Sequence, residues 1–322
     1  MYGRFLYNQL FVTVPVPSTS FADQTVIITG ANVGLGLEAA RHITSLGAAK
    51  VILAVRNLAA GREAQQSIEA STGRSGVCEV WELDLASYAS VLDFGRRAAE
   101  LPRLDAVVEN AALATQKYER AEGHERTITV NVISTVLLGL LLLPKLRETT
   151  QKHHPGQKPR LSVVVSEVHA WTPFPEQRSD RIFEALDDEA HARMHERYPT
   201  SKLVVILALR EMVRQLRDDA VVINMINPGF CHSQLTREVS GIGIKAFKMA
   251  LARSTEEGSR TLVAGAAAGP ESHGQYMDCG VADSAGFSSF VRSDDGKKVQ
   301  EHIWRELSEI LEEIQPGVTS NL

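Results

Sequence analysis

The sequence predicts an α/β protein in which helices cover both faces of one doubly wound parallel sheet. Three observations support this prediction: short β-branched runs alternate with helical stretches, a glycine-rich turn joins the first run to the first helix, and polar residues follow the ends of several runs. Strands that alternate with helices of this length form parallel sheets. Right-handed crossovers then bring the carboxyl ends of the strands to one edge, where ligands bind.

Composition narrows the class of protein. The 322 residues are 44% hydrophobic and 23% charged, as in an ordinary globular domain, and the formal net charge of −5 argues against nucleic acid as a partner. Cys78, Cys231 and Cys279 are too few and too scattered for a disulfide framework or a zinc cluster. We find no set of metal ligands in the sequence, and we expect a reducing, cytoplasmic environment.

We divide the chain into an N-terminal extension, residues 1–21, and a single domain, residues 22–322. The polar Tyr7-Asn8-Gln9 interrupts the apolar residues of the extension, which is therefore too short and too mixed for a signal peptide or a membrane anchor. The longest apolar run, residues 136–143, is shorter than the about 18 residues of a membrane-spanning helix. We predict no membrane span, and an extension that packs on the domain or on a partner subunit.

The first strand, residues 25–28, is followed by the turn 29–36 and by a segment of helical composition. Gly30, Gly34 and Gly36 allow the backbone to turn tightly and to approach a pyrophosphate, which would rest on the amide groups at the helix start. A tight turn without a ligand is the alternative, but the position between a strand and a helix favours a dinucleotide site.

The next predicted strand, residues 50–55, ends without the carboxylate that would bind the ribose 2′-hydroxyl of NAD. Arg56 follows instead, and a guanidinium at this place suits a 2′-phosphate through charge-assisted hydrogen bonds. The sequence thus favours NADP(H) over NAD(H). The alternative is a surface arginine that caps the next helix.

Polar residues follow the later strands. We predict the following elements: helices at about 59–71, 87–100, 124–147 and 199–217, and strands at 77–83, 104–109, 161–166 and 220–226. Asp84, Asn110, Ser166 and the run Asn227-Pro228-Gly229 stand at or just after the ends of these strands. We therefore expect them to gather at the ligand-binding edge of the sheet.

Tyr198 and Lys202 are four residues apart, so both side chains leave the same face of a helix. A nearby ammonium favours the phenolate, so we expect Lys202 to lower the pKa of Tyr198 and to make it an acid/base candidate. Taken alone, such a pair is more often a packed ring beside a solvated charge. Pro199 should either begin this helix or bend it.

Together these residues resemble the short-chain dehydrogenase/reductase family over roughly residues 22–280. The resemblance is closest to its NADPH-using branch, which includes retinol-dehydrogenase-like enzymes and reductases of fungal secondary metabolism, and it implies a Rossmann-type fold. The matching pieces are Thr29-Gly30 with Gly34 and Gly36, Asp84-Leu85, Asn110-Ala111, Asn131, Ser166, Tyr198 with Lys202, and Asn227-Pro228-Gly229.

The resemblance implies a catalytic tetrad of Asn131, Ser166, Tyr198 and Lys202. Tyr198 would protonate a carbonyl oxygen that Ser166 holds, and Lys202 would bind the nicotinamide ribose. Asn131 would link Lys202 to a proton relay through its backbone and a water. From the residues alone, the amide of Asn131 would satisfy a backbone group inside an apolar helix, and Ser166 would begin a loop.

The resemblance also implies the residues that hold the cofactor. They are Gly30, Asn32, Gly34, Leu35 and Gly36 along the phosphates, Arg56 at the 2′-phosphate, Asp84 and Leu85 at the adenine, Asn110 at the ribose, and Tyr198, Lys202, Pro228, Gly229 and Ser233 toward the nicotinamide. The chain departs from the family at Glu109-Asn110-Ala111-Ala112, where the family has Asn-Asn-Ala-Gly.

Two segments should form the substrate side as lid insertions, residues about 167–197 and 230–253. The first carries the aromatic residues His169, Trp171, Phe174 and Phe183, and the second carries Gly241 and Gly243 as hinges. The alternative for the first segment is an excursion that packs on itself.

The last predicted helix, about 297–314, has one apolar stripe and should pack on the same domain or on a second subunit. The apolar helices at 127–147 and after Tyr198 could pair in a homodimer unless the chain's own extensions cover them.

These observations point to an NADPH-dependent carbonyl reductase or alcohol dehydrogenase that acts on a hydrophobic ketone or secondary alcohol. The alternatives are a non-redox isomerase, dehydratase or cyclase on the same scaffold, and a non-catalytic NADP(H)-binding protein.

Overall fold

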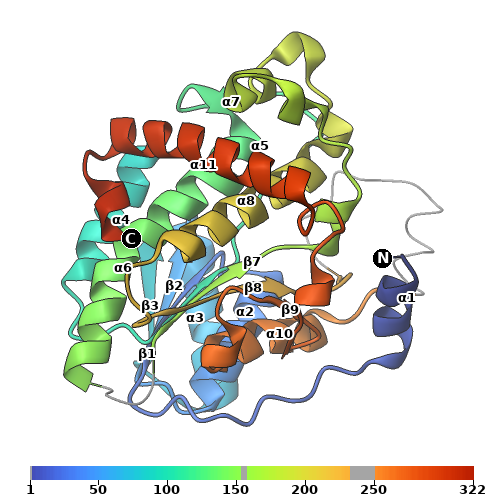
Figure 1. Ribbon diagram of the computed structural model, residues 1–322. Helices are drawn as coiled ribbons and strands as arrows, with labels where there is room; N and C mark the ends of the chain where they lie inside the picture. Colours follow the sequence, from blue (N-terminus) through green and yellow to red (C-terminus); the bar gives the residue numbers. More distant parts are fainter. Residues whose placement is uncertain (1, 154–157, 233–250) are drawn as a thin grey trace.

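A computed structural model of the chain describes residues 2–153, 158–232 and 251–322 (Figure 1). Its main sheet has eight strands in the order β10-β9-β8-β7-β4-β1-β2-β3. The strands are β1 (Thr25–Thr29), β2 (Lys50–Val55), β3 (Cys78–Glu82), β4 (Ala106–Glu109), β7 (Arg160–Val164), β8 (Val222–Asn227), β9 (Tyr276–Asp278) and β10 (Val281–Ala282). All neighbours pair in parallel except β9 and β10, so the predicted α/β fold with a doubly wound parallel sheet is confirmed.

Helices cover both faces of the sheet, and each face has its own core. The helices are α1 (Tyr2–Phe11), α2 (Gly34–Ser45), α3 (Leu58–Thr72), α4 (Tyr88–Ala99), α5 (Arg126–Ile128), α6 (Ser134–His153), α7 (Ile182–Leu186), α8 (Met194–Gln215), α10 (Thr255–Ala267) and α11 (Asp294–Ile314). One core joins the sheet to α2, α3 and α10, and the other joins it to α4, α6, α8 and α11. In Figure 1, α11 (red) crosses over α8.

Several elements of the fold were not predicted from the sequence. The two-residue strands β5 (Arg120–Ala121) and β6 (His124–Glu125) form a small separate sheet, and β9, β10, α1 and α10 were not predicted. A strand of two or three residues leaves no period-2 pattern long enough to recognise.

The helix that carries Tyr198 differs from the prediction. It begins at Met194, so Pro199 lies inside it and removes the N–H that would otherwise bond to the carbonyl of His195. Arg197 fixes this first part of α8: it is buried, donates to the carbonyl oxygen of Leu186 over 2.9 Å and lies 3.5 Å from the carboxylate of Glu125.

The long apolar helix 126–153 has the length and hydropathy of a membrane span, but 83% of its most apolar window is buried inside the molecule. It is the central core helix, interrupted by a π-helical turn at Thr129–Ile133. The chain's own C-terminal residues cover it and α8: α11 packs on α8, and the short helix Val318–Asn321 packs on α6. These two helices are therefore covered within one chain, where we had considered a homodimer contact.

The segment between Ser166 and Tyr198 is partly core. Phe174 and Phe183 are 1% and 3% exposed and join the main core together with residues of α8 and α11, so these two rings do not pack only within their own segment. Trp171 is 40% exposed and makes an edge contact with Phe5 of α1, 6.0 Å between ring centroids. Gly241 and Gly243, the predicted hinges of the second segment, lie outside the described residues.

Candidate active site

The glycine turn after β1 has the backbone that a phosphate site needs. Gly30 and Gly34 have φ of +67° and +61°, which residues with a Cβ rarely adopt. A Cβ on Gly36 would lie 2.6 Å from the main-chain oxygen of Gly30, so only glycine lets α2 approach the turn this closely. Leu35, in the first turn of α2, faces α10, where a Cβ on Gly258 would lie 2.8 Å from it.

The N-terminus of α2 has no side-chain cap. Its N-cap residue, Val33, makes no side-chain hydrogen bond, and its first turn carries no acidic residue, whereas Asn57, Ser87 and Ser254 cap α3, α4 and α10. Uncapped N–H groups together with the helix dipole form an anion site. The half-buried Asn32 lies in the same turn. This region therefore fits the pyrophosphate of a dinucleotide.

Arg56 and Asp84 stand at the ends of the two strands beyond β1. Arg56 is exposed directly after β2, and Asn57 rather than Arg56 caps the helix that follows. After β3, Asp84 Oδ1 accepts from the N–H of Ala86 over 2.9 Å, and the side chain of Leu85 is buried in the core. A contact of Leu85 with adenine would therefore come from its main chain.

Asn110 holds the glycine turn. Its amide nitrogen donates to the carbonyl oxygens of Thr29 and Gly30 over 2.9 and 3.5 Å, and the hydroxyl of Thr29 accepts from the N–H groups of Asn110 and Ala111. Because these donors are occupied, a ribose contact of Asn110 would be made by one of its oxygens.

Glu109, which replaces an asparagine of the family, is 5% exposed, and neither carboxylate oxygen has a hydrogen-bond partner among the described residues. Burial raises its pKa well above the ordinary value, so this side chain is a neutral acid in the core.

The end of β8 supplies Pro228 and Gly229. Pro228 is buried, and Gly229 has φ of +74° with its N–H donating to Asn227 Oδ1 over 3.2 Å. Ser233, predicted to lie near the nicotinamide carboxamide, is outside the described residues.

Tyr198 and Ser166 lie close together. Ser166 follows β7 by two residues, and its hydroxyl is near enough to the half-buried Tyr198 to influence the pKa of the phenol. We expected Lys202 to lower the pKa of Tyr198, and this was wrong. Burial raises that pKa above its ordinary value, the carboxylate of Glu167 raises it further, and the hydroxyl of Ser166 opposes both only in part. The phenol is therefore neutral at physiological pH, which is the form that can donate a proton.

Lys202 lies beneath the ring of Tyr198. Its Nζ is 5.7 Å from the ring centroid and donates to the carbonyl oxygen of Val164 over 2.8 Å, and the residue is 4% exposed. Burial lowers the pKa of Lys202 to about 8, so it is charged at neutral pH but close to its titration. The ammonium thus lies beside the face of the ring and interacts with β7.

Asn131 occupies the π-helical turn and bridges three segments. Its Oδ1 accepts from the N–H of Leu113 over 2.8 Å, and its Nδ2 donates to Leu113 O and to Ser201 Oγ over 2.8 and 2.9 Å. The side chain satisfies a backbone group, as the residues alone suggested, and it also fixes Ser201, the neighbour of Lys202. π-Helical turns are frequent at functional sites.

His169 holds the backbone of Ser166, a role that the sequence did not indicate. Its Nε2 accepts from the N–H of Ser288 over 3.0 Å, so the proton is on Nδ1, which donates to the carbonyl oxygen of Ser166 over 2.7 Å. Burial lowers the pKa of His169 to about 4, which keeps the ring neutral. In the sequence, this contact is indicated by spacing alone: the histidine follows, by three residues, a serine at the end of a predicted strand.

Comparisons with known proteins identify the family of the chain. Residues 24–157 match the family model described as short chain dehydrogenase. The chain is 45% identical to Short-chain dehydrogenase anuD of Penicillium roqueforti, over 98% of this chain and 84% of the relative. It is also 45% identical to Short chain dehydrogenase/reductase dmxR8 of a Cryptosporiopsis species, over 98% of this chain and 99% of the relative.

Solved structures share the fold. An uncharacterized protein from Mycobacterium paratuberculosis superposes with a TM-score of 0.66 at 25% identity, covering 91% of this chain and 95% of the other. An NADPH-bound carbonyl reductase from chicken fatty liver superposes with a TM-score of 0.60 at 18% identity, covering 82% and 99%. Together with the fungal relatives, the family match establishes that the chain belongs to the short-chain dehydrogenase/reductase family, as an oxidoreductase that acts on CH–OH or C=O groups.

Proposed function

We propose that the protein is an NADP(H)-dependent carbonyl reductase or alcohol dehydrogenase that acts on a hydrophobic ketone or secondary alcohol. The observation that carries this proposal is a neutral Tyr198 close to Ser166, with Lys202 beneath the ring. Ser166 follows β7, at the edge of the sheet where the glycine turn follows β1, and Tyr198 comes from α8.

Each residue of the site has its own role in the proposed reaction. In the direction of reduction, Tyr198 donates its phenol proton to the carbonyl oxygen while Ser166 donates a hydrogen bond to the same oxygen. NADPH held at this site would supply a hydride to the carbonyl carbon. Lys202 would bind the nicotinamide ribose, and Asn131 keeps Ser201 and the adjoining turn of α8 in place.

Two features support NADP(H) as the cofactor. Arg56 stands exposed after β2, where no carboxylate is available for a ribose 2′-hydroxyl. The uncapped start of α2 offers N–H groups to the pyrophosphate. Relatives titled with NADPH or NADP share this fold, which is consistent with the proposal.

The exposed Trp171 beside Phe5 supports a hydrophobic substrate, because Phe5 lines the same cavity as Glu167, the residue after Ser166. Cys78, Cys231 and Cys279 are free and buried, which is consistent with a cytoplasmic location. We extend the proposal to a role in secondary metabolism because the sequence motifs resemble those of fungal reductases of that kind, and the two relatives named above are fungal dehydrogenases.

The test is NADPH oxidation with a panel of aryl and alicyclic ketones. We expect wild-type protein to oxidise NADPH with at least one ketone, and Tyr198→Phe to lower kcat by about 10²- to 10⁴-fold, because general acid catalysis is lost. The matched control is Tyr7→Phe, which removes the hydroxyl of an exposed tyrosine on α1. NADPH affinity should stay unchanged in both variants. Full turnover by Tyr198→Phe would refute the role, and tight NADPH binding without any turnover would indicate a non-catalytic protein.

A further inference from the structure

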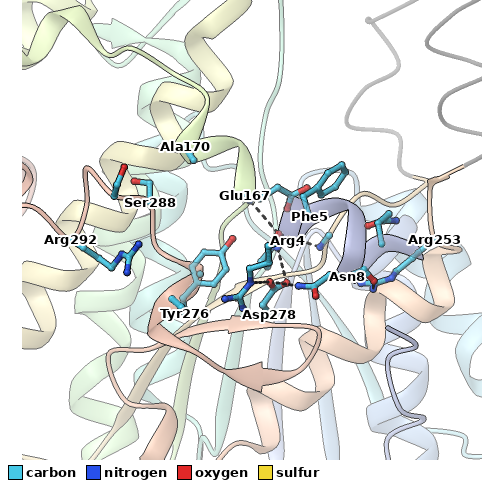
Figure 2. A pocket seen from close by; sticks show the side chains of 16 residues that line it. Arg4, Phe5, Asn8, Glu167, Ala170, Arg253, Tyr276, Asp278, Ser288 and Arg292 are labelled. Atoms are coloured by element: carbon cyan, nitrogen blue, oxygen red, sulfur yellow. Dashed lines mark hydrogen bonds and ion pairs between the residues drawn. The ribbon is translucent and has the colours of Figure 1, made fainter. Parts of the chain in front are cut away.

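A cavity of about 390 Å³ lies beside the catalytic serine and is distinct from the glycine turn (Figure 2). Glu167 and Ala170, directly after Ser166, form one wall, and Gly229 and Arg253 form another. The remaining walls come from α1, from β9 and from residues 285–292. Glu167 belongs to this wall and its charge acts on the phenol of Tyr198, so the cavity neighbours the site of Ser166 and Tyr198.

The N-terminal helix α1 is a fixed wall of the cavity. Gln9 Nε2 donates to the carbonyl oxygens of Phe230 and Leu251 over 2.7 and 2.5 Å, and Gln9 Oε1 accepts from the N–H of Phe230 over 3.2 Å. Arg253 is 6% exposed and donates to the carbonyl oxygens of Asn8 and Val12. One glutamine and one arginine therefore attach α1 to the residues after β8.

The charges around the cavity are largely paired with one another. Arg4 lies 3.2 Å from the carboxylate of Asp278 and 2.8 Å from that of Asp283. Asp278 also accepts from the side-chain amides of Asn8 and Asn227, over 2.7 and 3.1 Å. Figure 2 shows Arg4 and Asn8 of α1 converging on Asp278. An ionic ligand would have to break these pairs.

Two buried polar atoms in the cavity wall have no hydrogen-bond partner among the described residues. They are Oε2 of Glu167, a residue 9% exposed, and the hydroxyl of Tyr276, a residue 1% exposed. An unsatisfied buried polar group costs about 1–3 kcal/mol, so each of the two calls for a partner.

The ring of Tyr276 is held firmly. Its centroid lies 5.7 Å from that of His169 and 5.4 Å from that of Phe287, and a Cβ on Gly286 would lie 2.2 Å from the ring. The hydroxyl therefore has a fixed direction. In Figure 2, Tyr276 and Glu167 border the same space, with Phe5 as an apolar neighbour.

We infer that this cavity is a substrate subsite that binds a neutral hydroxyl group, remote from the reacting carbon, between Glu167 and Tyr276. A ligand hydroxyl is both donor and acceptor, so it can donate to the carboxylate and accept from the phenol. Apolar atoms next to that hydroxyl would lie against Phe5 and Ala170. The inference rests on the proposed function and assigns its substrate class: hydrophobic ketones that carry a second oxygen as a phenol or an alcohol.

The test compares 1-tetralone, 6-hydroxy-1-tetralone and 6-carboxy-1-tetralone as ligands of the full chain in the presence of NADP⁺, which cannot reduce a ketone. Calorimetric dissociation constants need no turnover, so a failure of reductase activity would not affect this measurement. At pH 8, above the pKa of about 7 of Glu167, we expect the hydroxylated ketone to bind about tenfold more tightly than 1-tetralone, as a hydrogen bond to a charged group predicts.

Tyr276→Phe and Glu167→Gln should each reduce this ratio to below about twofold, whereas Tyr7→Phe should keep it. Tyr276→Phe should also unfold within about 2 °C of wild type, because the hydroxyl that it removes has no partner in the protein. A wild-type ratio near one, or no binding of either ketone, would mean that the two atoms are only hydrated and would overturn the inference. So would a ratio that survives both substitutions, or tighter binding of the carboxylate, which would point to the exposed Arg292 at the cavity.

Discussion

At the scale of single residues, burial shifts the pKa values of the site residues more than neighbouring charges do. The pKa of Tyr198 is raised and that of Lys202 is lowered, both chiefly because the side chains are buried. The pair is thus a neutral proton donor beside an ammonium that is close to its titration. Such a pair can supply a proton at neutral pH without first forming a phenolate.

Arg56→Ala should change the choice of nucleotide. Loss of the guanidinium removes charge-assisted bonds to a 2′-phosphate, so the KM for NADPH should rise about 10- to 100-fold while the KM for NADH stays within about twofold. Arg62→Ala, at an exposed position on α3, is the matched control. An unchanged ratio of the KM values for NADPH and NADH would show that Arg56 does not bind the 2′-phosphate.

Glu167 gives a pH-dependent stability. Burial raises its pKa from 4.5 to about 7, so between these values the folded protein binds the extra proton. Stability from this group is present below pH 4.5 and is lost as the pH rises through 7. Relative to Glu167→Gln, wild-type protein should lose up to about 3 kcal/mol in the free energy of unfolding over this range.

Urea denaturation at a series of pH values measures that difference. Buried groups such as Glu109 and His169 occur in both proteins, so their contributions cancel. A difference between wild type and Glu167→Gln that does not change with pH would show that Glu167 is solvated.

At the scale of elements, α1 forms a wall of the cavity that we propose as a substrate subsite. Because Gln9 bonds to both Phe230 and Leu251, its loss should loosen the cavity wall without touching the reactive groups. Gln9→Ala should raise the KM for the ketone about tenfold and leave kcat within about twofold. Gln66→Ala, on the exposed face of α3, should change neither. An equal fall in kcat, or no effect on either constant, would contradict this role for α1.

The elements differ in how far the sequence predicts them. The glycine turn was predictable because positive φ at Gly30 and Gly34 requires glycine, and because a strand precedes it. Tyr198 and Lys202 were predictable because helix spacing alone places them together. The start of α8 was not predictable from the sequence. The buried Arg197 forms ion pairs with residues far along the chain, and these pairs stabilise a helical turn before Pro199.

The contacts of Gln9 and His169 could not be predicted from the sequence either. Their partners lie 221 and 119 residues away, and a polar side chain in a short segment carries no pattern that indicates such a partner. The raised pKa of Tyr198 was missed for a similar reason, since burial depends on tertiary packing that the spacing of two residues does not show.

At the scale of the whole molecule, the chain covers its own apolar helices. α11 packs on α8, and Asn321 Nδ2 donates to the carbonyl oxygen of Leu140 of α6 over 3.1 Å. A dimer through these two helices would have to displace the C-terminal residues. We therefore expect a monomer in solution, with the chain mass of 35.2 kDa.

Light scattering after size-exclusion chromatography, at micromolar concentration, measures this mass directly. A stable species of about 70 kDa, twice 35.2 kDa, would contradict the expectation. Truncation after Ile314 removes the segment that covers α6 and should favour association, because it exposes apolar surface.

The central claim is that the protein transfers a hydride to a carbonyl carbon while Tyr198 donates the proton. The most direct test is reduction of a ketone with NADPH deuterated at C4, in the two stereochemical forms, followed by mass spectrometry of the product. Wild-type protein should give an alcohol with one deuterium on the carbinol carbon from one of the two forms, and Tyr198→Phe should bind NADPH but give almost none. Product formed without deuterium from either form, or labelled product from Tyr198→Phe at the wild-type rate, would contradict the claim.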